Sequence, residues 1–473
     1  MAQSTAAPRP IPHPSPLRRR TVAGYAIGSL GTGGFGTLPG LVLLYYMTDS
    51  LGITALVAGL IVTVAKLWDV VIDPVIGALS DRMRQRSGTR RTLMLVGALS
   101  LPLFFAATFA VPAELTGSLA ALWVLIAFVL STTAFSLFQV PYIALPVEIA
   151  GDYDGRTRLL TWRVVVLTVA ILVFGAGGPV LRGLGDDPRL GYLLMGVVAG
   201  LVISIGLSAS SFTAPRGLAA GGGAPSRVAD AYRQALVVLR ESRPLRRLLG
   251  GFVLQALATG LMLAAAQYVA TWVLVSEDSV TLLFLALIAP AVLVTPVWGR
   301  LARRYGKERM YLLASVLFGV AALSIVIAVI APGAWIYLPV GVAGAAYAGM
   351  QALPLAMLPD VIAHDGRRRG RERAGVVSGV WTAGETAGMA LGATLLALVL
   401  SIAGYVESTA EVVVVQPASA TLAIVLAFSV IPAALVAASI LVLRGYGLSR
   451  RDIDTPAPVG APVSDDQPAG DDR

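Results

Sequence analysis

Twelve apolar stretches, each long enough to cross a membrane as a helix, limit the folds that this chain can adopt. A helix needs about 20 apolar residues to cross about 30 Å of hydrocarbon. Of the 473 residues, 56% are apolar and only 13% are charged, a balance that soluble globular proteins rarely reach. The 50 glycines and 28 prolines suit closely packed, bent helices better than a sheet. The sequence therefore predicts an all-α membrane protein with twelve transmembrane helices, near residues 22–47, 54–80, 92–112, 117–147, 163–184, 190–212, 247–275, 279–299, 310–331, 334–362, 375–403 and 420–443.

The distribution of basic residues predicts the orientation of these helices. All Lys and Arg residues fall in the two tails or in loops after even-numbered helices, except Lys66, Arg182 and Arg189. Because basic loops stay in the cytoplasm, we expect both termini there and a location in the plasma (inner) membrane. The net charge of +9 then reports orientation in the lipid bilayer, so we expect no nucleic-acid partner. We also expect a monomer.

A polar segment near the middle of the chain divides the helices into two halves of six. Two corresponding loops, at residues 77–82 and 299–307, resemble the G-x-L-x-D-R-x-G-[RK] signature of the major facilitator superfamily, whose halves are repeats about an axis along the membrane normal. Asp81 holds the acidic position in the first loop, and Arg303 replaces it in the second. The predicted units are a disordered cytoplasmic tail (1–20), an N-terminal half (21–213), a linker with an amphipathic surface helix (214–246), a C-terminal half (247–444) and a disordered acidic tail (445–473).

The second predicted helix carries three ionisable residues on one face. Lys66, Asp69 and Asp73 are spaced by three and four residues, which aligns them along a helix. Charged side chains within a membrane segment are costly, so they indicate a functional site. Two carboxylates suit a hard cation such as Na⁺, or a shared proton, and Ser136 of the fourth helix could add a hydroxyl ligand. The alternative is a Lys66–Asp69 ion pair that only holds helices together.

Other polar residues in the predicted spans leave two interpretations open. Gln139 and Tyr142 lie three residues apart beside a proline, where they could face a substrate cavity or simply link helices. Glu385 lies ten residues inside the eleventh helix, which has no basic residue. It could be a protonatable group of the cavity or a partner of a distant cation such as Arg163. Arg163 itself could instead extend to the lipid headgroups.

Two acidic residues lie where predicted helices reach the basic loops. Glu148 ends the fourth helix and Asp360 ends the tenth. We expect both to act as gate or loop partners of the arginine-rich loops rather than as substrate ligands.

Several kinds of chemistry are poorly supported by this sequence. Cysteine is absent and only two histidines occur, which disfavours thiolate chemistry and a histidine metal site. No nucleotide-binding P-loop, H-E-x-x-H or G-x-S-x-G motif occurs. We therefore expect no enzyme activity, no catalytic residues, no cofactor and no metal beyond a coupling cation.

Three stretches resemble the glycoside-pentoside-hexuronide:cation symporter family, the group that contains the melibiose permease. They span residues 66–77, 139–163 and 357–381, the last of which ends at Trp381 of the predicted cavity. The resemblance implies cation-coupled symport, with Asp69 and Asp73 as cation ligands and Ser136 as a hydroxyl ligand.

The substrate contacts of that family are not kept. At the positions where the resemblance implies a helix-one aspartate, a helix-four aspartate and an aromatic residue of the sugar-binding members, this chain has Gly33, Gln139 and Ile143, which we expect to line the substrate cavity. Glu385 replaces a helix-eleven lysine.

The sequence thus predicts a symporter of a sugar or sugar-like solute, driven by Na⁺ or H⁺, that works by alternating access. An animal relative on the same fold carries lysolipids with the same helix-two acids, so a lysolipid or hydrophobic metabolite is an alternative substrate. A membrane sensor or scaffold that transports nothing is the alternative from another class.

Overall fold

The computed structural model describes residues 17–150, 153–185, 187–217, 228–276, 279–369, 374–409 and 414–447. These residues form helices and no strand, apart from an isolated bridge between Leu51 and Thr409. Twelve helical segments of the described residues are long and apolar enough to cross a membrane, which agrees with the predicted count.

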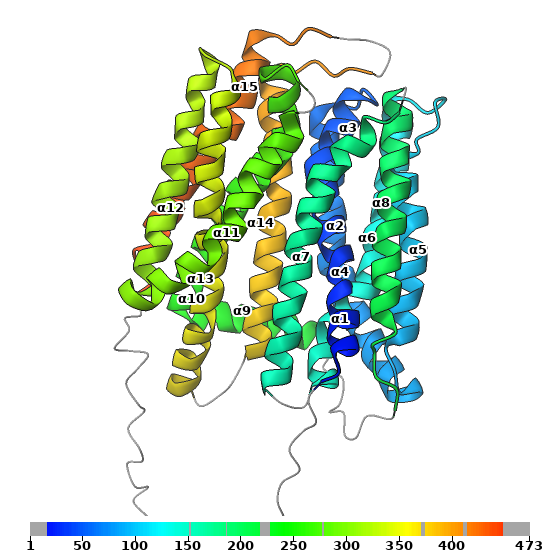
Figure 1. The fold of residues 1–473 in the computed structure, drawn as a ribbon, viewed down its shortest axis with the longest axis vertical. Helices are drawn as coiled ribbons and strands as arrows, with labels where there is room; N and C mark the ends of the chain where they lie inside the picture. The colour runs from blue at the N-terminus through cyan, green and yellow to red at the C-terminus, as the bar shows by residue number, and fades with distance from the viewer. Residues whose placement is uncertain are drawn as a thin grey trace, which may run out of the picture.

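The first six spans form one side of the bundle and the last six form the other (Figure 1). The first side comprises α1 (Arg19–Ile27), α2 (Ser29–Leu38), η1 (Pro39–Leu43), α3 (Leu44–Asp49), α4 (Ala55–Ser87), α5 (Arg91–Phe109), α6 (Gly117–Ile149), α7 (Tyr153–Arg182) and α8 (Pro188–Ser211). The second comprises α10 (Arg243–Tyr268), η2 (Val269–Val273), α11 (Ser279–Tyr305), α12 (Lys307–Ser324), η3 (Ile325–Val329), η4 (Ala334–Ile336), α13 (Tyr337–Arg369), α14 (Ala374–Ile402), α15 (Ala418–Phe428) and α16 (Val430–Leu443).

The two halves repeat the same packing pattern. In the first half α2 packs on α7, α5 on α6 and α8, and α4 on α6; in the second, α10 packs on α14, α12 on α13 and α16, and α11 on α13. Each pair of the first half corresponds, by the order of its helices, to a pair of the second half, as expected for parallel repeats. Small residues allow the closest of these approaches: a Cβ built on Gly392 of α14 would lie 2.5 Å from the backbone of Gly260 in α10.

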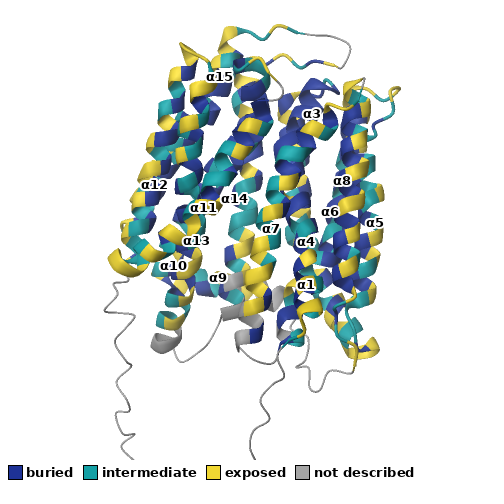
Figure 2. Ribbon diagram, viewed as in Figure 1, coloured by how far each residue is buried: buried dark blue, intermediate teal, exposed yellow. Residues whose placement is uncertain are grey.

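The surface of the bundle is apolar along its length. Exposed residues run the length of the helices in Figure 2 instead of gathering at the ends. Many of them are large and aliphatic, such as Ile205, Leu293 and Leu338, each at least 70% exposed. Such an extensive apolar surface is unfavourable in water and is typical of a protein surrounded by lipid.

Local features shift several boundaries from the predicted positions. The fifth span begins as a helix at Tyr153, about ten residues earlier than expected from hydropathy, because its first turns are polar. The first span contains a π-helical turn at Pro39, and the last is interrupted at Ser429. In the predicted linker, α9 (Val228–Glu241) buries Val238 and exposes Leu236. The predicted disordered tails lie outside the described residues, except for 17–20 and 445–447.

Candidate functional site

The helix α4 places the three predicted ionisable residues together. This helix is 33 residues long and continues without a break past Pro74. The Nζ of Lys66 lies 3.3 Å from Oδ2 of Asp69, so the ion pair considered from sequence is present. The side chain of Asp69 is only 14% exposed. The charges of Lys66 and Asp69 both act on Asp73, one turn further along.

Each of the two aspartates retains a carboxylate oxygen without a partner. Oδ1 of Asp69 and Oδ1 of Asp73 are buried and accept no hydrogen bond from the described residues. Ser136 of α6 lies near enough to Asp73 for its hydroxyl to interact with that carboxylate, so the structure brings together the three residues that were predicted to bind a cation. Two free carboxylate oxygens and a hydroxyl form a donor set that fits a hard cation. The pair with Lys66 engages only one of the four carboxylate oxygens.

Two residues predicted for the cavity in the N-terminal half pack between helices in this structure. Tyr142 is fully buried: its hydroxyl donates to the Tyr25 carbonyl at 2.9 Å and lies 3.0 Å from Ser29 Oγ. It links helices instead of lining a cavity. Gly33 packs on α7, where an added Cβ would lie 2.6 Å from Ala170. The next turn of α2 presents Gly36 to open space instead.

Gln139 is partly buried and contacts the first span of its own half. Its Oε1 accepts a hydrogen bond of 2.9 Å from Thr32 of α2. Ile143, one turn further along α6, is 50% exposed.

The two cavity residues predicted in the C-terminal half, Glu385 and Trp381, both lie on α14. Glu385 of α14 is partly buried and acts electrostatically on Tyr347 of α13. Trp381 is only 2% exposed and stacks on Phe252 of α10, with ring centroids 4.3 Å apart. The indole thus packs between helices of its own half, and a role for Trp381 in the cavity stays a prediction.

The residues predicted as gate or loop partners lie where the basic loops meet the helices. Arg90 binds Asp81 at 2.7 Å and Glu148 at 2.8 Å. Burial alone would lower the pKa of Arg90, but the Glu148 and Asp81 carboxylates raise it, so the guanidinium stays charged. Lys307 pairs with Asp360 at 2.6 Å. A role in gating stays a prediction for all of them.

Arg163 does not extend away from the protein. Its guanidinium carbon lies 5.3 Å from the centroid of the Tyr142 ring, a cation–π contact inside the N-terminal half.

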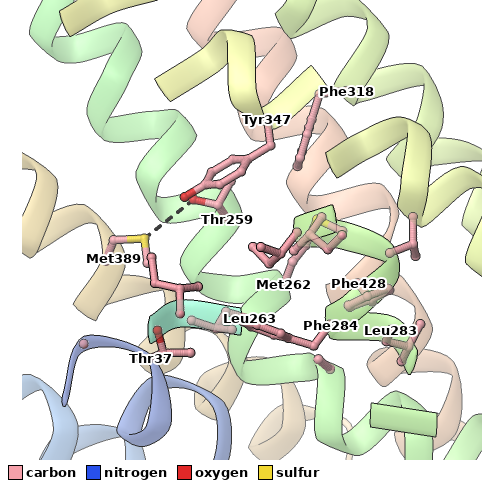
Figure 3. Close-up of a pocket in the computed structure, with 16 residues that line it drawn as sticks. Thr37, Thr259, Met262, Leu263, Leu283, Phe284, Phe318, Tyr347, Met389 and Phe428 are labelled. Carbon is pink, nitrogen blue, oxygen red and sulfur yellow. Dashed lines mark hydrogen bonds between the residues drawn. The ribbon is translucent and has the colours of Figure 1, made fainter. Parts of the chain in front are cut away.

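An apolar cavity of about 220 Å³ lies between the two halves. Figure 3 shows the aromatic and aliphatic side chains that surround it. Its lining residues come from α2 and α7 on one side and from six helices of the C-terminal half on the other: Gly36, Thr37, Ile171, Thr259, Met262, Leu263, Ala266, Leu283, Phe284, Leu287, Ile288, Phe318, Val340, Tyr347, Met389 and Phe428. No aspartate, glutamate, lysine or arginine belongs to this lining.

A cluster of hydrogen-bonded side chains joins the two halves at the end of the bundle where α3 and α15 lie (Figure 1). We call this cluster the latch; its members are Thr48, Asp49, Tyr268, Trp272 and Tyr405. Thr48 Oγ1 lies 2.7 Å from the Tyr268 hydroxyl, and the Tyr405 hydroxyl donates to Oδ1 of Asp49 at 2.6 Å. Trp272 Nε1 donates to the Tyr405 hydroxyl at 2.9 Å. Burial and the charge of Asp49 raise the pKa of Tyr405, which keeps its hydroxyl a donor.

Sequence reasoning missed the latch. Asp49 lies two residues beyond the first predicted helix, and a carboxylate at a membrane boundary resembles an ordinary surface residue. In the structure Asp49 is only 8% exposed, and this burial cannot be deduced from the sequence. The signal available in the sequence was the run of hydroxyl-bearing residues around it, Tyr45, Tyr46 and Thr48.

Comparison with known proteins places the chain in a family. Residues 24–450 match the family described as MFS/sugar transport protein. The chain belongs to this family. Family members are secondary transporters, and the chain is accordingly a multi-pass membrane protein of the transport type, with the twelve spans described above.

Individual relatives agree with this family. An uncharacterized symporter of Synechocystis sp. is 26% identical over 92% of this chain and 95% of its own length. A sodium-dependent lysophosphatidylcholine symporter of Danio rerio is 23% identical over 89% of this chain and 84% of its own. Among solved structures, a nucleoside transporter is similar with a TM-score of 0.65 at 10% identity, covering 91% of this chain and 98% of that one, and it shows the fold alone.

Proposed function

We propose that this MFS/sugar transport family member is a cation-coupled symporter, with Asp69, Asp73 and Ser136 as the cation site. The observation that carries the proposal is the pair of buried Oδ1 atoms that have no partner among the described residues. A buried carboxylate oxygen without a partner is destabilising. Na⁺ or H⁺ bound between the two side chains would remove that cost.

Neutralisation of these charges would couple the cation to the solute. Rocking of the halves must move the site into a closed, poorly hydrated state, and the net negative charge of the empty site opposes that step. A bound cation lowers this barrier, and a solute that holds the two halves together lowers it further. Each ligand then favours the binding of the other, which is the thermodynamic condition for symport.

The latch would close one side of this cycle. Its hydrogen bonds join residues of both halves, so opening the α3 end requires them to break. In the orientation predicted from the basic loops, with cytoplasmic termini and a plasma-membrane location, this end faces outward. The structure would then be an outward-closed state.

The solute is proposed to carry a sugar or sugar-like group. The description of the family supports this substrate class. A specific observation favours the alternative of a hydrophobic solute, namely the apolar lining of the inter-half cavity.

Uptake into proteoliposomes tests the proposal. The purified protein should accumulate solute when a Na⁺ or pH gradient is imposed, and the accumulation should collapse when an ionophore dissipates that gradient. Solute binding with no net flux under either gradient would instead indicate a sensor.

Replacement of Ser136 by Ala should weaken cation binding without disturbing the fold. Loss of one hydroxyl ligand should cost about 1 kcal/mol, or roughly fivefold in affinity. The shift in melting temperature on titration with Na⁺ or H⁺ measures it. Ser131→Ala in the same helix is the control, because that serine is also buried, with a hydroxyl that has no partner in the described residues. Equal cation affinity in both variants would remove Ser136 from the site.

A further inference from the structure

The inter-half cavity offers little to a polyhydroxylated solute. Among its lining residues, Thr259 already donates to the carbonyls of Gln255 and Ala256 in its own helix. The Tyr347 hydroxyl accepts a hydrogen bond of 2.7 Å from Gln351. Most of the remaining contacts are aliphatic or aromatic (Figure 3). Sugar hydroxyls moved here from water would lose hydrogen bonds that the walls do not replace.

A polar layer lies one helical turn to one side of this cavity. On α2, Thr32 precedes Gly36 by four residues and binds Gln139. On α14, Glu385 precedes Met389 by four, and on α13, Gln351 follows Tyr347 by four. Successive spans cross the membrane in opposite directions, so α2 and α14, the first and eleventh spans, run one way and α13, the tenth, runs the other. Thr32, Glu385 and Gln351 are therefore all displaced from the cavity toward the same end of the bundle.

The cation site lies at the depth of this polar layer. The antiparallel helices α4 and α14 are aligned by the hydrogen bond between Thr63 and Thr394. Asp73 follows Thr63 by ten residues and Glu385 precedes Thr394 by nine, so both lie about 14 Å from that contact along the bundle.

We propose that the solute is amphipathic, with its apolar body in the inter-half cavity and its polar end in the layer of Gln139, Gln351 and Glu385. This inference rests on the proposed function of the chain as a transporter. A glycoside with an apolar aglycone and a single-chain lipid share this chemistry. The polar end would lie next to the coupling cation, and the apolar body would supply binding energy from both halves.

Gly36 provides a direct test, because it faces the cavity without supporting the fold. A Cβ built on Gly36 meets nothing within 4 Å, so Gly36→Leu should fill the cavity without a clash. Gly379 in α14 is a matched control: it is also helical and exposed, its Cβ also meets nothing within 4 Å, and it does not line the cavity.

The probes are two series measured by thermal shift on the protein in lipid nanodiscs. One comprises glucose and its butyl, hexyl and octyl β-glucosides below micellar concentrations; the other comprises glycerophosphocholine and its single-chain acyl derivatives. Affinity in the unmodified protein and in Gly379→Leu should rise about fourfold for each added methylene. Gly36→Leu should abolish this dependence. The series that binds more tightly at equal chain length identifies the polar end as sugar or phosphocholine.

Several outcomes would overturn the proposal. Glucose that binds as tightly as octyl glucoside would contradict it, as would an unchanged chain-length dependence in Gly36→Leu. Partition into the bilayer is common to all variants, so a chain-length effect present equally in all three reports the bilayer and also contradicts the cavity. Absence of binding by either series, in protein that the coupling cation still stabilises through Asp73, would overturn this inference and leave the proposed cation coupling intact.

Discussion

Substitution of either aspartate of α4 should abolish cation-driven uptake, and the two variants should differ in stability without cation. Asp73→Asn removes a buried charge whose Oδ1 has no partner, so we expect equal or higher stability of the cation-free protein. Asp69→Asn leaves Lys66 without its carboxylate partner, so we expect lower stability. In both variants the stabilisation by cation, about 2.7 kcal/mol at a hundred times the dissociation constant, should disappear.

Melting temperatures measured across a titration with Na⁺, and separately with pH, reveal both effects in one experiment. Asp187→Asn is the matched control, because this aspartate caps α8 outside the site and asparagine caps a helix equally well. Its cation response and uptake should equal those of the unmodified protein. Full gradient-driven uptake by either Asp69→Asn or Asp73→Asn would exclude these aspartates as the coupling site.

The number of helices and the alignment of the two aspartates on one helix face could be predicted because they depend on local sequence. Hydropathy over about 20 residues reports each span, and a helix aligns Asp69 with Asp73 whatever surrounds it. Ser136 required a contact between α4 and α6, which the family resemblance supplied.

The lining of the inter-half cavity could not be predicted because it depends on which face each helix turns inward. Tyr142 and Gly33 resemble cavity residues in sequence, yet the packing of α1, α2 and α7 buries both. A polar side chain in a membrane helix can satisfy itself on a neighbouring helix as well as on a substrate. The position of Gly36 in the cavity wall could not be predicted from sequence, because it depends on the open space next to its Cα.

Tyr405→Phe should shift the protein toward states that are open at the α3 end. The variant keeps the edge contacts of its ring with Tyr268 and Trp272 but loses two hydrogen bonds, one to Asp49 across the halves and one from Trp272 within its own half. A buried hydrogen bond contributes about 1 kcal/mol, so the ratio of open to closed protein should rise roughly fivefold. Spin labels on Leu184→Cys and Ile330→Cys, exposed residues of opposite halves at this end, report the distance between the halves.

Because the chain contains no cysteine, the two labels are the only ones attached. Tyr46→Phe is the matched control: its hydroxyl donates to the Phe109 carbonyl at 3.1 Å, a buried bond near the same end but within one half. That loss should lower stability without lengthening the distance between labels. If the Tyr405→Phe distances match those of the unmodified protein, the latch is a passive contact. If they lengthen while those of Tyr46→Phe do not, the closed state depends on bonds that cross between the halves, as alternating access by rocking requires.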